Sequence, residues 1–268
     1  MSPEPLRPPT IDHRLLPHVA RIIVVASGKG GVGKSTVTAN LAHALTAVGQ
    51  RVGILDADIY GPSIPRLLGL DTYLKPEIAD GLMVPPTAHA IRAMSMALIT
   101  GDQATVLRAP MITKALVQFL RQVRWGTADA PLDVLLIDMP PGTGDITLSL
   151  AQNAPLDGVL LVTTPQQLAV IDAEKCAVAF TKMGVPLLGV IENMSYLALP
   201  GGARATPFGS GGGAELAARH HTKLLAQLPL DPDMGRAADA GENYIAKNAV
   251  ASGAAIFIDI ANYFANTA

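Results

Sequence analysis

The residues best suited to chemistry in this chain form a glycine-rich run at positions 28 to 36, which reads Gly-Lys-Gly-Gly-Val-Gly-Lys-Ser-Thr. Its spacing fits the pattern G-x-x-x-x-G-K-[ST] without a mismatch. Glycines let successive backbone N–H groups turn inward around phosphate oxygens, and a following helix adds the positive end of its dipole. Lys34 is placed to reach the outer phosphates, and the Ser35 hydroxyl is placed to hold Mg²⁺. The run predicts a nucleotide-phosphate site with these contacts: Gly28, Lys29, Gly30, Gly31, Val32, Gly33, Lys34, Ser35 and Thr36.

A carboxylate at the end of an apolar run is the second candidate. Residues 133 to 138 read Asp-Val-Leu-Leu-Ile-Asp, which predicts a buried strand that ends in Asp138. Beside a phosphate loop, such an acid binds Mg²⁺ directly or through water, so Ser35 and Asp138 are the predicted metal ligands. The glycines and prolines of residues 139 to 145 suit a switch that senses the γ-phosphate.

Lys29 and Asp58 are the predicted catalytic residues. Asp58 follows the apolar run 51–56, and the carboxyl ends of parallel strands gather at a ligand crevice. A carboxylate there orients a water for attack on the γ-phosphate, and the alternative is that it caps the next turn. Lys29 is not needed for phosphate binding within one subunit, since Lys34 does that. It is needed if two subunits face each other and each lysine neutralises charge at the partner's γ-phosphate.

Short apolar runs alternate with helical stretches from Arg21 onward, which is typical of a parallel sheet covered on both faces. Aromatic residues make up only 4% of the chain, so Ala, Val, Ile and Leu must fill the core. We therefore expect an α/β fold with a doubly wound, mostly parallel sheet. The predicted strands are 21–27, 51–56, 133–138, 157–163, 186–191 and 224–228. The predicted helices are 35–48, 110–124, 145–153, 167–183, 212–220 and 253–265.

Two segments fit this alternation less well. Residues 76 to 108 contain prolines and short β-like runs such as Ile91 to Met96, and they are predicted to leave the sheet as an irregular excursion. The glycine-rich segment from Gly201 to Gly213 is interpreted as a loop that is either simply mobile or gated by a ligand.

The remaining composition limits the domain organisation and the class of partner. Residues 1–20 carry five prolines and are expected to form a flexible arm, with residues 21–268 as a single ATPase domain. The net charge of −2 argues against a nucleic-acid partner. The apolar runs are far shorter than the roughly 20 residues of a membrane span. The first 20 residues lack the layout of a secretory signal, so a cytoplasmic location is expected.

These motifs together resemble a known family. Residues 28–35 look like the deviant Walker A motif of the ParA/MinD group of dimeric P-loop ATPases. Within that group the chain is similar, over about residues 20 to 265, to the Mrp/ApbC branch, whose members are iron–sulfur cluster carriers. The resemblance implies the P-loop NTPase type of fold, with ATP and Mg²⁺ as cofactors. The further segments that carry it are Asp56–Ser63, Arg108–Met111, Asp138–Asp145, Thr164–Gln166, Glu192–Tyr196 and Phe208–Gly213.

The resemblance also implies a homodimer in which two ATP sites face each other. It implies Lys29 as the lysine that acts across the interface and Asp58 as the carboxylate that orients water. Asn193 is implied as an adenine contact, with the stretch around Pro229 and Asp231 beside the base. ATP hydrolysis is expected to be slow and coupled to conformational change, with an iron–sulfur apoprotein or assembly factor as the client.

The chain departs from the branch at the cluster ligands. Carriers have a Cys-x-x-Cys pair shortly after the motif at 192–196, and two subunits together supply four thiolates to a bridging cluster. Leu199 and Gly202 hold those positions here, and neither can ligate iron. Cys176 is the single cysteine and is interpreted as a small core residue. The small N-terminal domain of some members is not expected before residue 20. The main prediction is therefore a nucleotide-gated ATPase dimer that lacks its own cluster ligands.

Three other hypotheses stay open. The first keeps cluster transfer, with ligands from Cys176 or from a partner protein. The second is a positioning ATPase like ParA or MinD, which would place the apolar stripe at Ile256, Phe257, Ile260 and Phe264 on a membrane; core packing is preferred, because nothing basic follows Lys247. The third is a small-molecule kinase, for which no acceptor pocket is apparent in the sequence.

Overall fold

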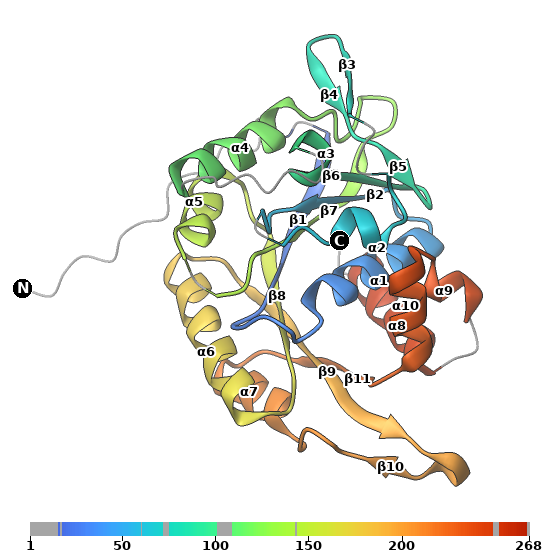
Figure 1. Ribbon diagram of the computed structural model, residues 1–268. Coiled ribbons are helices and arrows are strands. Elements are labelled where there is room, and N and C mark those ends of the chain that lie inside the picture. Colours follow the sequence, from blue (N-terminus) through green and yellow to red (C-terminus); the bar gives the residue numbers. More distant parts are fainter. Residues whose placement is uncertain are drawn as a thin grey trace, which may run out of the picture.

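A nine-stranded sheet forms the centre of the computed structural model, which describes residues 16, 18–59, 61–71, 75–100, 109–142, 144–248 and 252–266. The strand order is β10-β9-β8-β1-β7-β2-β6-β5, and β11 also pairs with β9 (Figure 1). The short strands β10 and β5 are antiparallel to their neighbours, and the pairs among the longer strands are parallel. The strands are β1 (Val19–Ala26), β2 (Val52–Asp56), β5 (Thr87–Ala88), β6 (Ile91–Ser95), β7 (Leu132–Asp138), β8 (Gly158–Thr163), β9 (Leu187–Ala198), β10 (Arg204–Ala205) and β11 (Leu224–Pro229), with a separate hairpin of β3 (Glu77–Ala79) and β4 (Leu82–Val84).

Helices cover both faces of this sheet, because successive strand residues point to opposite sides. In β1, Ile22 and Val24 belong to one hydrophobic core, whereas Ile23 and Val25 belong to the other. The first core lies under α4, α5, α6 and α7, and the second lies under α1, α2, α8, α9 and α10 (Figure 1). The helices are α1 (Lys34–Ala47), α2 (Ile64–Leu67), α3 (Ala97–Thr100), α4 (Ala109–Gln122), α5 (Asp145–Asn153), α6 (Gln167–Lys182), α7 (Gly212–Arg219), α8 (Pro232–Ala240), α9 (Tyr244–Lys247) and α10 (Ser252–Asn266).

The strand register brings the chemically important residues to one edge of the sheet. Asp138 at the end of β7 pairs in register with Val25 of β1 on one side and with Asp56 of β2 on the other. The glycine-rich loop follows β1 directly and leads into α1. The loop and the two carboxylates therefore meet at the carboxyl ends of three neighbouring parallel strands, where α/β folds bind ligands.

The six predicted strands and six predicted helices are confirmed as elements of the predicted type. Their ends agree with the predictions to within two residues, except that β9 continues to Ala198. The prediction that residues 91–96 leave the sheet is wrong, because β6 pairs in parallel with β2 from Ile91 to Ser95. This strand is only five residues long and is almost entirely buried, so it shows no alternation that would mark it as a strand. Residues 101–108 of the same predicted excursion lie outside the described residues, as does most of the predicted N-terminal arm.

The C-terminal quarter contains two short helices that the hydrophobic pattern did not predict, α8 and α9. A local signal for α8 exists, because Asp231 caps the helix by accepting a hydrogen bond from the Asp233 N–H at 2.8 Å, and Pro232 takes the first helical position. The glycine-rich segment 201–213 also contains regular structure, since it includes β10 and the start of α7.

The apolar stripe of α10 belongs to the protein core. Phe257, Ile260 and Phe264 are buried in the second hydrophobic core, which leaves them unable to face a membrane. Among the described residues, no helix is both long enough and apolar enough to cross a bilayer.

Candidate functional site

The glycine-rich loop curves around a cavity of about 250 Å³ at the start of α1. Gly31 and Gly33 have φ angles of +80° and +79°, a left-handed conformation that side-chain-bearing residues rarely adopt. No side chain caps the first turn of α1, so its N–H groups and the positive end of its dipole serve the cavity. Whole-ligand pockets are typically larger, from about 300 to 1,000 Å³, so the cavity suits the phosphate end of a nucleotide. It is lined by Ser27, Lys29, Gly30, Gly31, Val32, Gly33, Lys34, Ser35, Thr36, Asp58, Ser63, Leu67 and Pro141.

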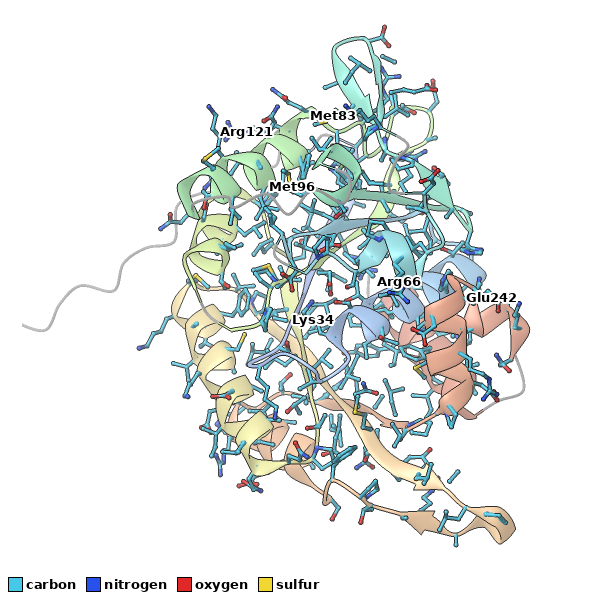
Figure 2. All side chains as sticks on the ribbon, in the orientation of Figure 1. Lys34, Arg66, Met83, Met96, Arg121 and Glu242 are labelled. Atoms are coloured by element: carbon cyan, nitrogen blue, oxygen red, sulfur yellow. The ribbon has the colours of Figure 1, made fainter. Side chains whose placement is uncertain are left out.

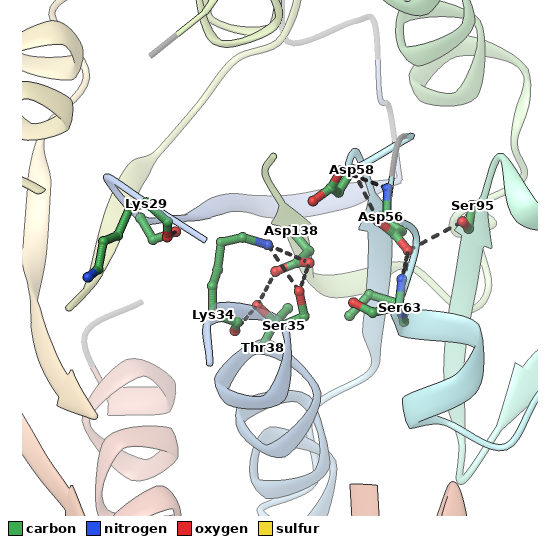
Figure 3. Close-up of polar contacts among 12 residues, drawn as sticks. Lys29, Lys34, Ser35, Thr38, Asp56, Asp58, Ser63, Ser95 and Asp138 are labelled. Atoms are coloured by element: carbon green, nitrogen blue, oxygen red, sulfur yellow. Dashed lines mark hydrogen bonds and ion pairs between the residues drawn. The ribbon is translucent and has the colours of Figure 1, made fainter. Parts of the chain in front are cut away.

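Asp138 is the centre of a buried polar cluster beside this loop (Figure 3). Its Oδ2 atom accepts hydrogen bonds from Lys34 Nζ at 2.7 Å and from Ser35 Oγ at 2.6 Å. Its Oδ1 atom accepts a hydrogen bond from Thr38 Oγ1 at 2.7 Å. The side chain of Asp138 is fully buried, and Lys34 also lies near the middle of the molecule (Figure 2). The structure therefore brings the predicted metal ligands Ser35 and Asp138 into direct contact, with the predicted phosphate-binding lysine on the same carboxylate.

Asp56 and Thr38 belong to the site although the sequence assigned them no role. The Asp56 carboxylate accepts hydrogen bonds from the N–H groups of Asp58, Ser63 and Ile64, which fixes the loop that carries Asp58. Burial, together with the nearby Asp138 carboxylate, raises the pKa of Asp56 well above its ordinary value. A signal for Thr38 was present in its spacing, because it lies one helical turn after Lys34 and so shares its face of α1.

Asp58 lines the cavity and is half-buried. Its Oδ1 atom accepts a hydrogen bond from the Gly61 N–H at 3.2 Å, so the turn-capping geometry is present together with access to the cavity. The two predicted roles of this residue do not exclude each other, because a carboxylate has two oxygens and several lone pairs.

Lys29 lies on the rim of the same cavity and is half-buried. Its side chain points away from Lys34 and Asp138 (Figure 3), and its carbonyl oxygen accepts a hydrogen bond from Ser27 Oγ at 3.0 Å. The two lysines of the loop therefore point in different directions, with Lys34 turned toward the buried Asp138 and Lys29 turned away from it.

The three predicted adenine contacts do not line the cavity. Asn193 is buried in β9 and contacts the loop from behind, as its Nδ2 atom donates to the Val32 carbonyl oxygen at 2.9 Å. Pro229 ends β11, and Asp231 caps α8 and accepts a hydrogen bond from the Tyr244 hydroxyl at 2.5 Å. Contact between these residues and a base stays a prediction.

The described residues do not fit an iron–sulfur cluster held by this chain alone. Leu199 and Gly202 lie at the exposed turn between β9 and β10. Cys176 is fully buried in α6, as predicted, and burial raises the pKa of its thiol to about 12, which opposes the thiolate form that binds iron. Among the described residues, no group of three or more His, Cys, Asp or Glu side chains is arranged to hold a metal ion.

Similarity to known proteins covers nearly the whole chain. A family model described as "ParA: NUBPL iron-transfer P-loop NTPase" matches residues 18–265. An iron-sulfur cluster carrier protein of Salmonella typhimurium is 47% identical over 247 residues, which are 91% of this chain and 66% of that protein. The Escherichia coli K12 protein of the same name is 50% identical over 226 residues, 83% of this chain and 60% of that protein. A third protein of this name, from Pseudomonas fragi, is 48% identical over 85% of this chain and 79% of its own length. The chain thus spans less than two thirds of the Salmonella and Escherichia relatives.

Solved structures show the same fold. A nucleotide-binding protein of Archaeoglobus fulgidus, solved in complex with ADP, is 37% identical with a TM-score of 0.74, over 86% of this chain and 90% of that one. The cell division ATPase MinD of Pyrococcus furiosus has a TM-score of 0.67 at 24% identity, over 93% of this chain and 100% of that one, which supports the fold alone. With its Walker-type loop, its strand-end aspartate and these matches, the chain belongs to the ParA family of P-loop NTPases, in the iron-transfer group that the matching model describes.

Proposed function

We propose that residues 21–268 act as one cytoplasmic ATPase domain, which works as a homodimer and whose nucleotide state controls the docking of a client protein. The observation that carries this proposal is the meeting of Lys34, Ser35 and Asp138 beside the loop cavity. These are the side chains that a phosphate-bound Mg²⁺ site requires, and they lie at the ligand-binding edge of the sheet. The similarity to an ADP-bound nucleotide-binding protein supports the same conclusion.

Each residue has a separate task in the proposed reaction. The loop N–H groups, the N-terminus of α1 and the Lys34 ammonium bind the phosphate groups. Ser35 and Asp138 would hold Mg²⁺ through their oxygens, and the ion would neutralise charge on the phosphates. Asp58 lies on the cavity wall, where its carboxylate is available to orient the attacking water.

The orientation of Lys29 supports a dimer. A lysine that serves its own phosphate site would turn toward Asp138 as Lys34 does, but the Lys29 side chain points away from both residues. A second subunit facing the cavity would receive this ammonium group close to its own phosphates, where it would stabilise negative charge in the transition state.

The client is proposed to be an iron–sulfur apoprotein or assembly factor, because relatives at 47–50% identity are named as iron-sulfur cluster carriers. This identity also favours a second candidate, a carrier whose cluster is held with ligands from the partner protein. A cluster that is ligated wholly by this chain is disfavoured, since Leu199, Gly202 and the buried Cys176 offer no thiolates.

The direct test measures molecular mass and phosphate release for the wild-type chain and for Asp58→Ala, each with and without ATP and Mg²⁺. We expect the variant to bind ATP, to release little phosphate and to stay at twice the monomer mass. Asp129→Ala, at an exposed loop position, is the matched control and should behave as wild type. An ATP-saturated Asp58→Ala chain that remains monomeric would exclude the dimer.

Iron and labile sulfide analysis separates the two candidates. After anaerobic reconstitution, the isolated chain should hold far less than one [4Fe–4S] cluster per dimer. A stoichiometric cluster on the isolated protein would contradict the proposed loss of ligands, and a cluster that forms only with an apoprotein partner would favour the second candidate.

A further inference from the structure

The contact between β9 and the phosphate loop joins two segments that are 161 residues apart in the chain. Asn193 is 5% exposed, and its Nδ2 atom donates to the carbonyl oxygen of Val32 at 2.9 Å. The group that faces this carbonyl must be the NH₂ end of the amide, because a carbonyl oxygen only accepts. The same amide packs against the next residue of the loop, since a Cβ atom on Gly33 would stand 2.3 Å from Nδ2.

The geometry of a trans peptide gives this contact a consequence inside the cavity. The C=O of Val32 and the N–H of Gly33 belong to one planar peptide group and point in opposite directions. A carbonyl that is held outward against Asn193 therefore turns the Gly33 N–H to the opposite side, where Gly33 lines the cavity. In this way the Asn193 side chain, on one side of the loop, controls the direction of the Gly33 N–H on the cavity side.

The strand that carries Asn193 is held firmly on both sides of this residue. The Glu192 carboxylate is fully buried and accepts hydrogen bonds from Ser195 Oγ at 2.6 Å, from the Gly213 N–H at 2.6 Å and from Gln227 Nε2 at 2.9 Å. Met194 has a φ angle of +53°, a conformation that costs free energy in a non-glycine residue and persists where the surroundings hold it. The Asn193 amide is thus presented to the loop by a fixed segment.

We propose that Asn193 is a positioning residue of the phosphate loop, which aims the Val32–Gly33 peptide at the phosphate groups and so sets affinity for the polyphosphate. The inference rests on the proposed nucleotide binding and deepens it. A residue that positions the loop affects every ligand with a polyphosphate group, whatever its base. A residue that contacts adenine affects ATP alone.

The test compares the dissociation constants of ATP, GTP and inorganic tripolyphosphate, each with Mg²⁺, by calorimetry. Asn193→Asp is the informative variant, because it keeps the size of the side chain and removes the N–H donor. We expect all three ligands, including the tripolyphosphate that has no base, to bind about tenfold more weakly. Asn193→Ala should show the same uniform loss and covers the case in which the aspartate variant folds poorly.

Asn40→Asp is the matched control for both variants. Asn40 is also 5% exposed, and its Nδ2 atom donates at 2.9 Å to a backbone carbonyl, that of Thr36 within α1. This change should leave the affinities of the three ligands as they are in wild type. A loss for Asn193→Asp that is confined to ATP would assign Asn193 to the base, and unchanged binding of tripolyphosphate would overturn the inference. A wild-type chain that binds none of the three would instead overturn the proposed function, and the inference with it.

Discussion

A buried histidine in α1 makes the stability of this protein dependent on pH. His43 is 2% exposed, and neither of its ring nitrogens has a hydrogen-bond partner among the described residues. Its ring lies edge-on to His89 with 5.2 Å between the ring centroids. Burial, followed by the charge of His89, lowers the pKa of His43 from 6.5 to about 4.

The sign and the size of the effect follow from this difference. The unfolded chain takes up the proton near pH 6.5, whereas the folded chain resists it until about pH 4. The free energy of unfolding therefore has its full value above pH 6.5 and falls as the pH is lowered toward 4. At about 1.4 kcal/mol per pKa unit, the total loss is about 3 kcal/mol, and about 2 kcal/mol of it is reached by pH 5.

Urea denaturation at pH 7.5, 6 and 5 measures this loss, with His43→Leu as the variant that cannot titrate. The wild-type chain should lose about 2 kcal/mol more than the variant between pH 7.5 and pH 5. Buried carboxylates that titrate in the same range are common to both chains and cancel in the difference. His221→Asn is the control, since His221 is exposed and its positive φ suits asparagine. If the free energy of unfolding changed with pH in the same way for the wild type and His43→Leu, the lowered pKa of His43 would not be the cause.

Three further predictions concern the phosphate loop. Gly28→Ala should lower the free energy of unfolding by about 1–3 kcal/mol or more, because the new Cβ would stand 2.0 Å from the backbone of Asp172. A Cβ at Gly30 would have no atom within 4 Å, so Gly30→Ala should change the free energy of unfolding by less than about 0.5 kcal/mol. Equal effects of the two substitutions in thermal denaturation would contradict the packing argument. Lys29→Ala should keep the wild-type affinity for ATP in calorimetry but lose about 100-fold or more in phosphate release, and undiminished turnover would remove its proposed role. Lys34→Met should abolish nucleotide binding, and near-normal affinity for ATP would exclude it from the phosphate site.

The parts of the fold that the sequence predicted well are those with a local signal. The loop at 28–36 is defined by a contiguous motif, and β1 and β7 are runs of apolar residues flanked by recognisable turns. The strand β6 had no such signal, because its place beside β2 depends on a pairing between residues about 40 positions apart. A short buried strand of this kind can be identified only when its neighbouring strands are known, because its own sequence has no distinctive pattern.

The residues of the candidate site also divide into those with a local sequence signal and those without one. Lys34, Ser35 and Asp138 were assigned from motif and strand pattern, and the structure places them in contact. The contribution of Asp56 to the position of Asp58 depends on three backbone N–H groups in a turn, and no side-chain pattern records where those groups point. The contact of Asn193 with Val32 similarly requires the strand order, which brings β9 next to β8 and near β1.

The contacts of Asp138 have a consequence for the order in which ligands enter. Both oxygens of this carboxylate are engaged, and its charge is matched within the protein by the Lys34 ammonium. If Asp138 is a magnesium ligand as proposed, an ion that arrives alone would have to displace the Lys34 ammonium from this carboxylate. Phosphate oxygens would offer Lys34 another partner and so would free the carboxylate to hold the metal. In the proposed ATPase the cluster would therefore favour binding of the metal together with the nucleotide, and the buried charge would stay compensated throughout.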